Sequence, residues 1–325
     1  MIGEQLTRAN IPQPAKKLPS VIPFTILAIL ILFFFYYFFK QLPKLMSLDL
    51  ANYDEERMEV HISYFQYMFS KSLVFFVFMS MYLTTKSKLL RILSVSMALV
   101  IALSMLQKAL VFYIFLCLIL NAYLDKKNIP VMRMVMIFVF LISLATLVSY
   151  IIYQSDIDIT LFAVLRRIFF LPADLTFVTM EMADFRHYMF YGGASFKTLF
   201  DALGWPSVYL GQETYLYYFG VYIEAATANS PALTSAYADL SYMGVIFAFL
   251  LGIYFGLLDS MYRSEGSSQS IYMRAAYVAC IICVMKFNVT NIGTALVSEG
   301  FLVSSLLLTL FFFSSRTKKL KFSWN

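Results

Sequence analysis

The stretch VMRMVMIFVFLISLATLVSYIIY, residues 131–153, decides the fold class of this protein. Its one charged residue is Arg133, near the start, and the rest is almost entirely apolar. A helix needs about 20 apolar residues to cross the hydrocarbon core of a bilayer. Backbone N–H and C=O groups in lipid must find partners within their own segment, so this stretch is predicted to be a membrane-spanning helix.

The rest of the chain repeats this pattern. It is 61% hydrophobic and 14% charged, with a mean hydropathy of +0.74, which is far from the balance of a soluble domain. We therefore expect an all-α integral membrane protein whose residues 1–325 form a single polytopic membrane domain. The first apolar run is too long for a signal-peptide core and lacks a small-residue cleavage site, so we expect it to be retained. Eight spans are predicted, at residues 21–39, 68–84, 91–107, 109–124, 131–153, 235–258, 272–289 and 293–313.

The distribution of basic residues sets the expected orientation. The net charge of +6 would suit a nucleic-acid-binding protein, but the positions of the charges argue against that class. Short segments that would all face one way hold 15 of the 25 basic residues, the pattern of cytoplasmic loops. Both termini are predicted to be cytoplasmic, and residues 154–231 to form a long loop outside. The 15 residues are Arg8, Lys16, Lys17, Lys86, Lys88, Arg91, Lys126, Lys127, Arg133, Arg263, Arg274, Arg316, Lys318, Lys319 and Lys321.

The long loop is unusually aromatic. Seventeen of its 78 residues are Phe, Tyr or Trp, too many for a freely solvated loop. We expect two helical pieces divided at Pro172 and lying along the membrane interface, with turns at Gly192-Gly193 and at Gly204-Trp205-Pro206. The rings either anchor the loop at the interface or stack against sugar faces.

Several polar residues fall within or beside the apolar spans. Only 33 residues separate Arg91 from Asp125, which predicts a short hairpin whose apex places Lys108 either in a polar cavity or snorkelling to water. Lys286 and Glu299 lie near the outer ends of the last two spans, where an ion pair would reduce the cost of placing charge in lipid. The cysteines, Cys117, Cys280 and Cys283, are expected to pack as small apolar residues, with redox or metal chemistry at the C-x-x-C pair as the alternative.

The cations predicted outside carry the main functional hypothesis. Topology does not require them, and Arg166 and Arg167 are expected to be buried among Leu165, Ile168 and Phe169. Arginine suits phosphate because its planar fork donates two hydrogen bonds at once. Anchoring to lipid headgroups is the alternative. No phosphate loop, H-E-x-x-H motif or acidic metal cluster is found, so neither a metal nor another cofactor is expected. The predicted outer cations are Arg57, Lys108, Arg166, Arg167 and Arg186.

Three stretches carry a resemblance to a known family. They are LSMLQK (residues 103–108), VLRRIFFLPA (164–173) and ANSPALTSAYADLSYMG (228–244), the last with Ser241 where a glycine is usual. Through them the chain resembles the Wzy-type oligosaccharide repeat-unit polymerases, which build O-antigen and capsular polysaccharide.

The resemblance implies a membrane glycosyltransferase of the bacterial inner membrane. Its substrates would be undecaprenyl-pyrophosphate-linked oligosaccharides, with a flippase and a chain-length regulator as partners. Arg166 or Arg167, assisted by Arg57 or Arg186, would stabilise the pyrophosphate as it leaves. A general base would activate the acceptor hydroxyl. The candidates for this base are His187, Glu213 and Asp239, and further substrate contacts are expected from Lys108 and Asn229.

Three other functions remain open from the sequence. A lipid-linked oligosaccharide flippase or polysaccharide exporter would use the same cations to guide a headgroup, with polar residues at the membrane midplane. An O-antigen ligase would transfer glycan to a lipid A core. A non-enzymatic scaffold would use the arginines only to bind lipid.

Overall fold

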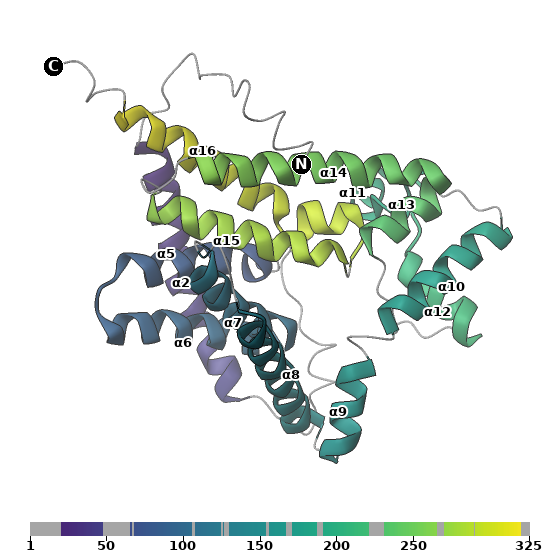
Figure 1. The fold of residues 1–325 in the computed structure, drawn as a ribbon, viewed down its shortest axis with the longest axis horizontal. Coiled ribbons are helices and arrows are strands. Elements are labelled where there is room, and N and C mark those ends of the chain that lie inside the picture. Colours follow the sequence, from purple (N-terminus) through teal and green to yellow (C-terminus); the bar gives the residue numbers. More distant parts are fainter. Residues whose placement is uncertain are drawn as a thin grey trace. The chain divides into compact units, whose positions relative to one another are not determined.

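The computed structural model is mostly helical over the residues that it describes, and none of these residues forms a strand (Figure 1). It describes residues 21–47, 66, 68–105, 108–124, 126, 130–153, 156–166, 171–186, 191–220, 231–264, 270–288 and 290–319. The chain forms two compact units. Within the described ranges, unit 1 comprises residues 165–257 and 283–302, and unit 2 comprises residues up to 164, 258–282 and those from 303 onward.

Four apolar runs are long enough to cross a membrane, which supports the prediction of an all-α membrane protein. They are Ile22–Met46, Val131–Ile151, Ala232–Ser264 and Ile271–Asn288. The first, second and fourth lie in α2 (Val21–Met46), in α8 (Val131–Tyr153) and in α15 (Ile271–Met285) with the 3-10 turn Lys286–Asn288. These runs correspond to the predicted spans 21–39, 131–153, 235–258 and 272–289.

The other four predicted spans are shorter or interrupted in the structure, so eight crossings are not established. The span at 68–84 is a π-helical turn, Phe69–Leu73, followed by α5 (Val74–Thr84). The third and fourth form α6 (Lys88–Ser104) and α7 (Lys108–Tyr123), of 17 and 16 residues. At a rise of about 1.5 Å per residue, these two helices are roughly 24–26 Å long, less than the ~30 Å hydrocarbon core. The predicted short hairpin is therefore confirmed.

Unit 2 is built around an aromatic and aliphatic core. Phe75, Phe76 and Phe78 of α5 and Ile101 of α6 are fully buried. The Tyr37 hydroxyl of α2 donates to Met105 Sδ at 3.1 Å, just beyond the end of α6. These contacts bury the apolar faces of α2, α5 and α6 against one another, and in a bilayer van der Waals packing holds such faces together.

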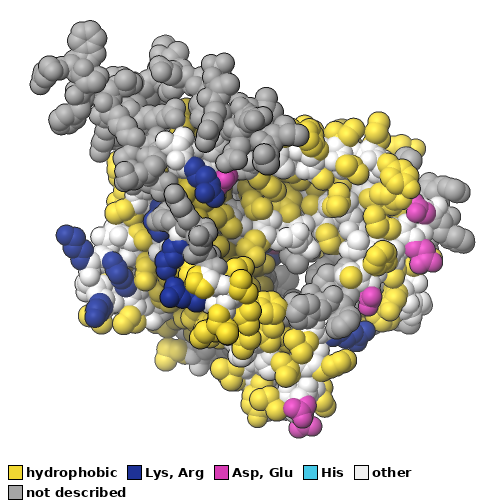
Figure 2. Space-filling view, viewed as in Figure 1, with side chains coloured by type: hydrophobic (Ala, Val, Ile, Leu, Met, Phe, Trp, Pro, Cys, Tyr) yellow, Lys and Arg dark blue, Asp and Glu magenta, His cyan; other side chains and the backbone are white. Residues whose placement is uncertain are grey.

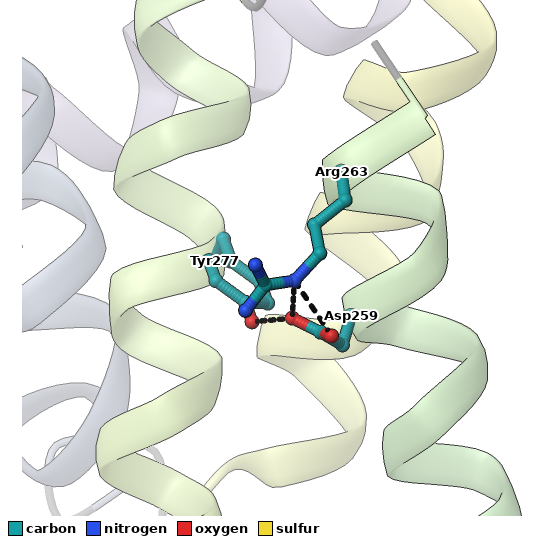
Figure 3. Close-up of polar contacts among 3 residues, drawn as sticks. All are labelled: Asp259, Arg263 and Tyr277. Atoms are coloured by element: carbon teal, nitrogen blue, oxygen red, sulfur yellow. Dashed lines mark hydrogen bonds and ion pairs between the residues drawn. The ribbon is translucent and has the colours of Figure 1, made fainter. Parts of the chain in front are cut away.

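A polar network fixes the end of α14 (Gly244–Ser264) to α15 within unit 2 (Figure 3). Arg263 Nε donates to both carboxylate oxygens of Asp259, at 2.9 and 2.8 Å, and the Tyr277 hydroxyl donates to Asp259 Oδ1. The ring of Tyr262 stacks on that of Tyr277, with centroids 4.0 Å apart. The sequence assigned Arg263 only to membrane orientation, whereas the structure also gives it a local structural partner.

Two predicted spans are interrupted, which corrects the expectation of continuous helices. Within the predicted span 235–258, α13 (Ala232–Leu240) ends at a 3-10 turn, Ser241–Met243, before α14 begins. Ser241 has φ +52° and ψ −138°, a backbone conformation that suits glycine because a Cβ is strained there. The predicted span 293–313 is interrupted at Gly300, where φ is +77°, and α16 begins only at Phe301 and ends at Lys319.

The break at Ser241 explains the close packing of Gly244. A Cβ at Gly244 would lie 2.6 Å from the backbone carbon and oxygen of Ala236, so the chain folds back on α13 at a residue without a side chain. The Gly252 and Gly256 pair, by contrast, shows open space at both Cβ positions. This pair, spaced as G-x-x-x-G, therefore makes no close helix contact among the described residues.

Replacing Ser241 with glycine should stabilise the protein. Ser241→Gly relieves the strained backbone and should raise the free energy of unfolding by about 1 kcal/mol. Thermal unfolding can be followed with a thiol-reactive fluorophore, because Cys117, Cys280 and Cys283 are free and buried. Ser260→Gly, in the regular helix α14, is the matched control and should lower stability by about 0.5–1 kcal/mol. Equal destabilisation by both changes would contradict the strain at Ser241.

The predicted orientation can be tested at exposed positions. Figure 2 shows hydrophobic side chains over much of the visible face and basic side chains gathered near α5 and α6. Ser87, between those helices, is exposed and predicted to be cytoplasmic, whereas Leu203 is 51% exposed and predicted to be outside. An impermeant thiol reagent added to intact cells should label Leu203→Cys and spare Ser87→Cys. The reverse pattern would show that the orientation is inverted.

Candidate functional site

The long predicted loop folds as a helical cluster in unit 1. Its helices are α10 (Leu171–Arg186), α11 (Lys197–Leu203) and α12 (Leu210–Phe219). Helix α10 packs against both α12 and α13. The Thr179 and Thr214 hydroxyls are 2.8 Å apart, and the Tyr237 hydroxyl donates to Asp184 Oδ1 at 2.7 Å. The cluster's small buried core consists of Met182, Ala183, Ala194, Leu210 and Ala238, with Tyr217 and Tyr237 packed against it.

Asp239 is the central polar residue of this cluster. Its side chain is fully buried, and its two carboxylate oxygens accept the backbone N–H groups of Ala194 and Ser195, at 3.0 and 2.6 Å. A buried carboxylate is costly unless hydrogen-bonded, and bonds to a charged acceptor are about twice as strong as neutral ones. Asp239 thereby holds the turn at residues 191–196, where Gly192 has φ +95°. The predicted turn at Gly192-Gly193 is confirmed.

The same turn is tied to the last part of the chain. The Gly293 N–H donates to the Ser195 carbonyl oxygen at 2.6 Å. A Cβ at Gly293 would lie 2.9 Å from Phe196 Cα and 3.0 Å from Ser195 O, so only glycine allows this approach. Residues 191–196 therefore connect Asp239 on α13 to the segment that contains Gly293.

That segment, residues 286–300, has an irregular backbone rich in buried polar groups. It contains the 3-10 turn Lys286–Asn288 and the π-helical stretch Thr294–Ser298. The Asn291 Oδ1 accepts the N–H of Thr294 at 2.8 Å. Non-helical backbone at membrane depth is tolerated only where protein or a water-filled cavity surrounds it, and Lys286, Asn291, Ser298 and Glu299 are all buried.

Lys286 and Glu299 form the predicted ion pair. Lys286 Nζ lies 2.8 Å from Glu299 Oε2, and the two residues are only 2% and 7% exposed. The Cys283 thiol donates to the Glu299 backbone oxygen at 3.3 Å. The predicted pairing is confirmed. Buried ionisable pairs within apolar helical proteins are costly to maintain, which makes this pair a candidate for a functional role.

An apolar cavity lies close to these residues. It has a volume of about 170 Å³. Two of its lining rings, Phe255 and Phe287, pack edge-to-face with each other and with Phe301, with centroid separations of 5.2 to 5.4 Å. Its walls are Pro231, Ala232, Leu233, Ala236, Ala248, Leu251, Phe255, Phe287, Asn288 and Ile292.

Cysteine and metal chemistry have no identified centre in the described part of the chain. Cys280 and Cys283 form no disulfide and are buried in α15, as packing residues would be. Within the described ranges, no cluster of three or more His, Cys, Asp or Glu side chains is placed to hold a metal ion.

The arginines predicted to bind phosphate are only partly described. Arg166 follows α9 (Ile157–Leu165) directly and is exposed, so the expectation that it is buried among apolar side chains is wrong. Helices α9 and α10 confirm two helical pieces, but the division falls before Leu171, and Pro172 lies in the first turn of α10.

The other predicted site residues separate into two groups. Glu213, in the first turn of α12, is half-buried and shares unit 1 with Asp239. Lys108 begins α7 and Arg186 ends α10, but the positions of their side chains are outside the described structure. Arg57, Arg167, His187 and Asn229 lie outside the described residues. The roles assigned to all of these residues remain predictions.

Sequence reasoning missed the residues that organise this site. It considered Asp239 only as a base and did not single out Ser195 or Gly293. A glycine among the polar residues of an apolar span, as in the stretch NVTNIG (residues 288–293), was the available signal for a close backbone approach.

No protein-family model matches the chain, and comparison with curated proteins and with solved structures found no match.

The buried ion pair should be far more sensitive to mutation than an exposed one. Lys286→Met leaves Glu299 buried without its cation and should destabilise the protein by about 3–5 kcal/mol. The double variant Lys286→Met/Glu299→Leu removes both charges and should recover most of the lost stability. The stability of the wild-type protein, of Lys286→Met and of the double variant is measured by thermal unfolding of the purified proteins in detergent. A double variant as unstable as Lys286→Met would argue against charge burial as the cause.

An exposed lysine in the same unit provides the control. Lys197 pairs with Asp201 one turn later, with side chains 30% and 45% exposed. This bond lowers the pKa of Asp201 below its ordinary value. Solvent screens the pair, so Lys197→Met should change stability by less than about 1 kcal/mol.

Proposed function

We propose that this chain is a membrane glycosyltransferase that polymerises undecaprenyl-pyrophosphate-linked oligosaccharide repeat units into O-antigen or capsular polysaccharide. The observation that carries the proposal is the Asp239 contact. The stretch with the most extended family resemblance, residues 228–244, contains Asp239, and its carboxylate fixes the turn at residues 194–195. The segment that carries the family resemblance is therefore also the segment whose Asp239 carboxylate holds this turn of unit 1.

The architecture of unit 1 suits catalysis at a membrane surface. Residues from the long loop are joined through Ser195 and Gly293 to the irregular segment 286–300. Catalytic groups must be held in place before the reaction, because reorienting them during it costs the advantage of preorganised charge. A helical cluster fixed to apolar helices provides such a base, which a mobile loop would not.

The proposed reaction transfers a glycan from one lipid carrier to another. A hydroxyl of the acceptor repeat unit attacks the anomeric carbon of the donor glycan. The bond from that carbon to the pyrophosphate oxygen breaks, and the hydroxyl proton passes to a base, for which Glu213, Asp239 and His187 are the candidates. Negative charge builds on the leaving pyrophosphate. Arg166, exposed beside α9, is accessible to such an anion and can donate two hydrogen bonds to it.

Asp239 is the least accessible of the candidate bases. Both of its oxygens already accept backbone N–H groups, and the residue is fully buried. Glu213 is half-buried and needs a smaller rearrangement to reach a substrate hydroxyl. Within this proposal, Glu213 is therefore the preferred base of the two that the structure describes.

One observation favours a second function, a lipid-linked oligosaccharide flippase. Transporters often contain buried ionisable pairs and interrupted helices. Unit 1 has both, in the Lys286–Glu299 pair and the breaks at Ser241 and Gly300. A transport role would use the pair to couple headgroup movement to protonation.

Arg166→Lys tests the polymerase proposal. If Arg166 makes a two-pronged contact with pyrophosphate in the transition state, lysine cannot replace it. The loss should be about 2.7–4 kcal/mol of transition-state stabilisation, or roughly a hundredfold or more in rate. The assay is complementation of a polymerase-deleted strain, with polysaccharide length read on a gel. Arg133→Lys, at an exposed arginine predicted to be cytoplasmic, is the matched control and should restore full-length polymer.

The same strains separate the two functions. Loss of a polymerase leaves single lipid-linked repeat units on the outer leaflet, whereas loss of a flippase retains them on the inner leaflet. Full-length polymer from Arg166→Lys and from an Arg166→Lys/Arg167→Lys double variant would reject the pyrophosphate contact. Repeat units retained inside would favour transport.

A further inference from the structure

The apolar cavity of unit 1 has the chemistry of a hydrocarbon site. Nine of its ten lining residues are apolar, and Asn288 is the exception. Its volume is about 170 Å³. These walls suit an apolar group, because a sugar or a phosphate placed against them would lose hydrogen bonds to water with little replacement.

The position of the cavity indicates where the hydrocarbon would come from. Its walls belong to the apolar runs Ala232–Ser264 and Ile271–Asn288, with Pro231 just before the first run and Ile292 just beyond the second. On α14, beside the lining residues Ala248 and Leu251, the side chains of Phe249 and Leu250 are 64% and 54% exposed. If α14 crosses the membrane, these side chains face lipid, and acyl chains are the most abundant apolar groups at the cavity.

We propose that the cavity binds one acyl-chain segment of a bilayer phospholipid. Asn288 is the one polar residue of this lining, and it is exposed. Its amide can donate to an ester carbonyl oxygen of the lipid, the group that joins the acyl chain to the headgroup region. The site is independent of the proposed glycosyltransferase function and would remain if that proposal failed.

An occupied cavity would also support the irregular segment. Phe255 and Phe287 line the cavity and pack edge-to-face with Phe301, which is fully buried. Phe287 follows Lys286 directly, and Phe301 follows Gly300, the residue after Glu299. A bound chain therefore fills space on one side of the rings that flank the buried ion pair, where an empty cavity would leave them without contacts.

Photo-crosslinking in vesicles tests the proposal. The full-length protein is reconstituted in phosphatidylglycerol vesicles that contain a fraction of the same lipid with a diazirine on its acyl chain. After illumination, mass spectrometry locates the labelled residues. In the wild-type protein, labelling should be enriched at residues 231–236, 248–255 and 287–292 relative to the exposed apolar face of α8.

Two neighbouring leucines provide matched variants. Leu251→Trp fills the cavity, whereas Leu250→Trp places the same ring on the exposed face of α14. Labelling of residues 287–292 should fall about tenfold in Leu251→Trp, equivalent to about 1.4 kcal/mol of binding free energy, and stay unchanged in Leu250→Trp. Thermal unfolding with the thiol-reactive fluorophore checks that both variants are folded. Should Leu251→Trp fail that check, Ala248→Phe, compared with Val245→Phe, replaces it.

Three results would overturn the assignment. Equal labelling of the cavity and of α8 would mean that no site exists. Loss of the label on adding unlabelled polyprenyl phosphate, at a concentration where the same amount of unlabelled phosphatidylglycerol has no effect, would assign the cavity to a carrier lipid. Protein–protein adducts at residues 231–236 in place of lipid adducts would assign it to a second copy of this chain.

Discussion

The buried carboxylate of Asp239 is the interaction on which unit 1 depends. It satisfies two backbone N–H groups of the turn at residues 194–195, which would otherwise be buried without partners. With its N–H groups held on one side, the turn offers the Ser195 carbonyl oxygen to Gly293 on the other. One charged side chain thus determines how a long loop meets the last part of the chain. Removing it would leave unpaired polar groups in an apolar surrounding, where each costs about 1–3 kcal/mol.

Unit 1 and unit 2 use polar groups in different ways. In unit 2, the Asp259–Arg263–Tyr277 network joins two helices, and its ion pair, Asp259 with Arg263, is partly exposed, so solvent can replace that pair's bonds. In unit 1, Asp239, Lys286 and Glu299 are buried, so their bonds have no substitute. Polar groups that cannot exchange partners with water fix a structure more tightly, provided that all of them are paired. The buried charges of unit 1 therefore fix its geometry more tightly than the polar network fixes unit 2.

The sequence predicted the helical class and the long apolar runs, because length and hydropathy determine these features. It also predicted the Lys286–Glu299 pair, since two charges in neighbouring apolar segments have few other partners. It did not predict the breaks at Ser241 and Gly300, because composition carries no information on backbone direction. The exposure of Arg166 was missed for a similar reason: apolar neighbours in sequence need not cover a side chain in space. The Asp239 contact joins residues 44 and 45 positions apart, a pairing that no local pattern indicates.

The discontinuity of unit 1 constrains how this protein can be made. Residues 165–257 and 283–302 form one compact body, yet residues 258–282, which belong to the other, separate them in the chain. During synthesis, Ser195 can bond to Gly293, and Lys286 can pair with Glu299, only after Gly293 and Glu299 have left the ribosome. The contacts of the helical cluster with the segment 286–300 therefore form only after that segment has been made. Such long-range closure is slow to form and leaves aggregation-prone surface exposed meanwhile.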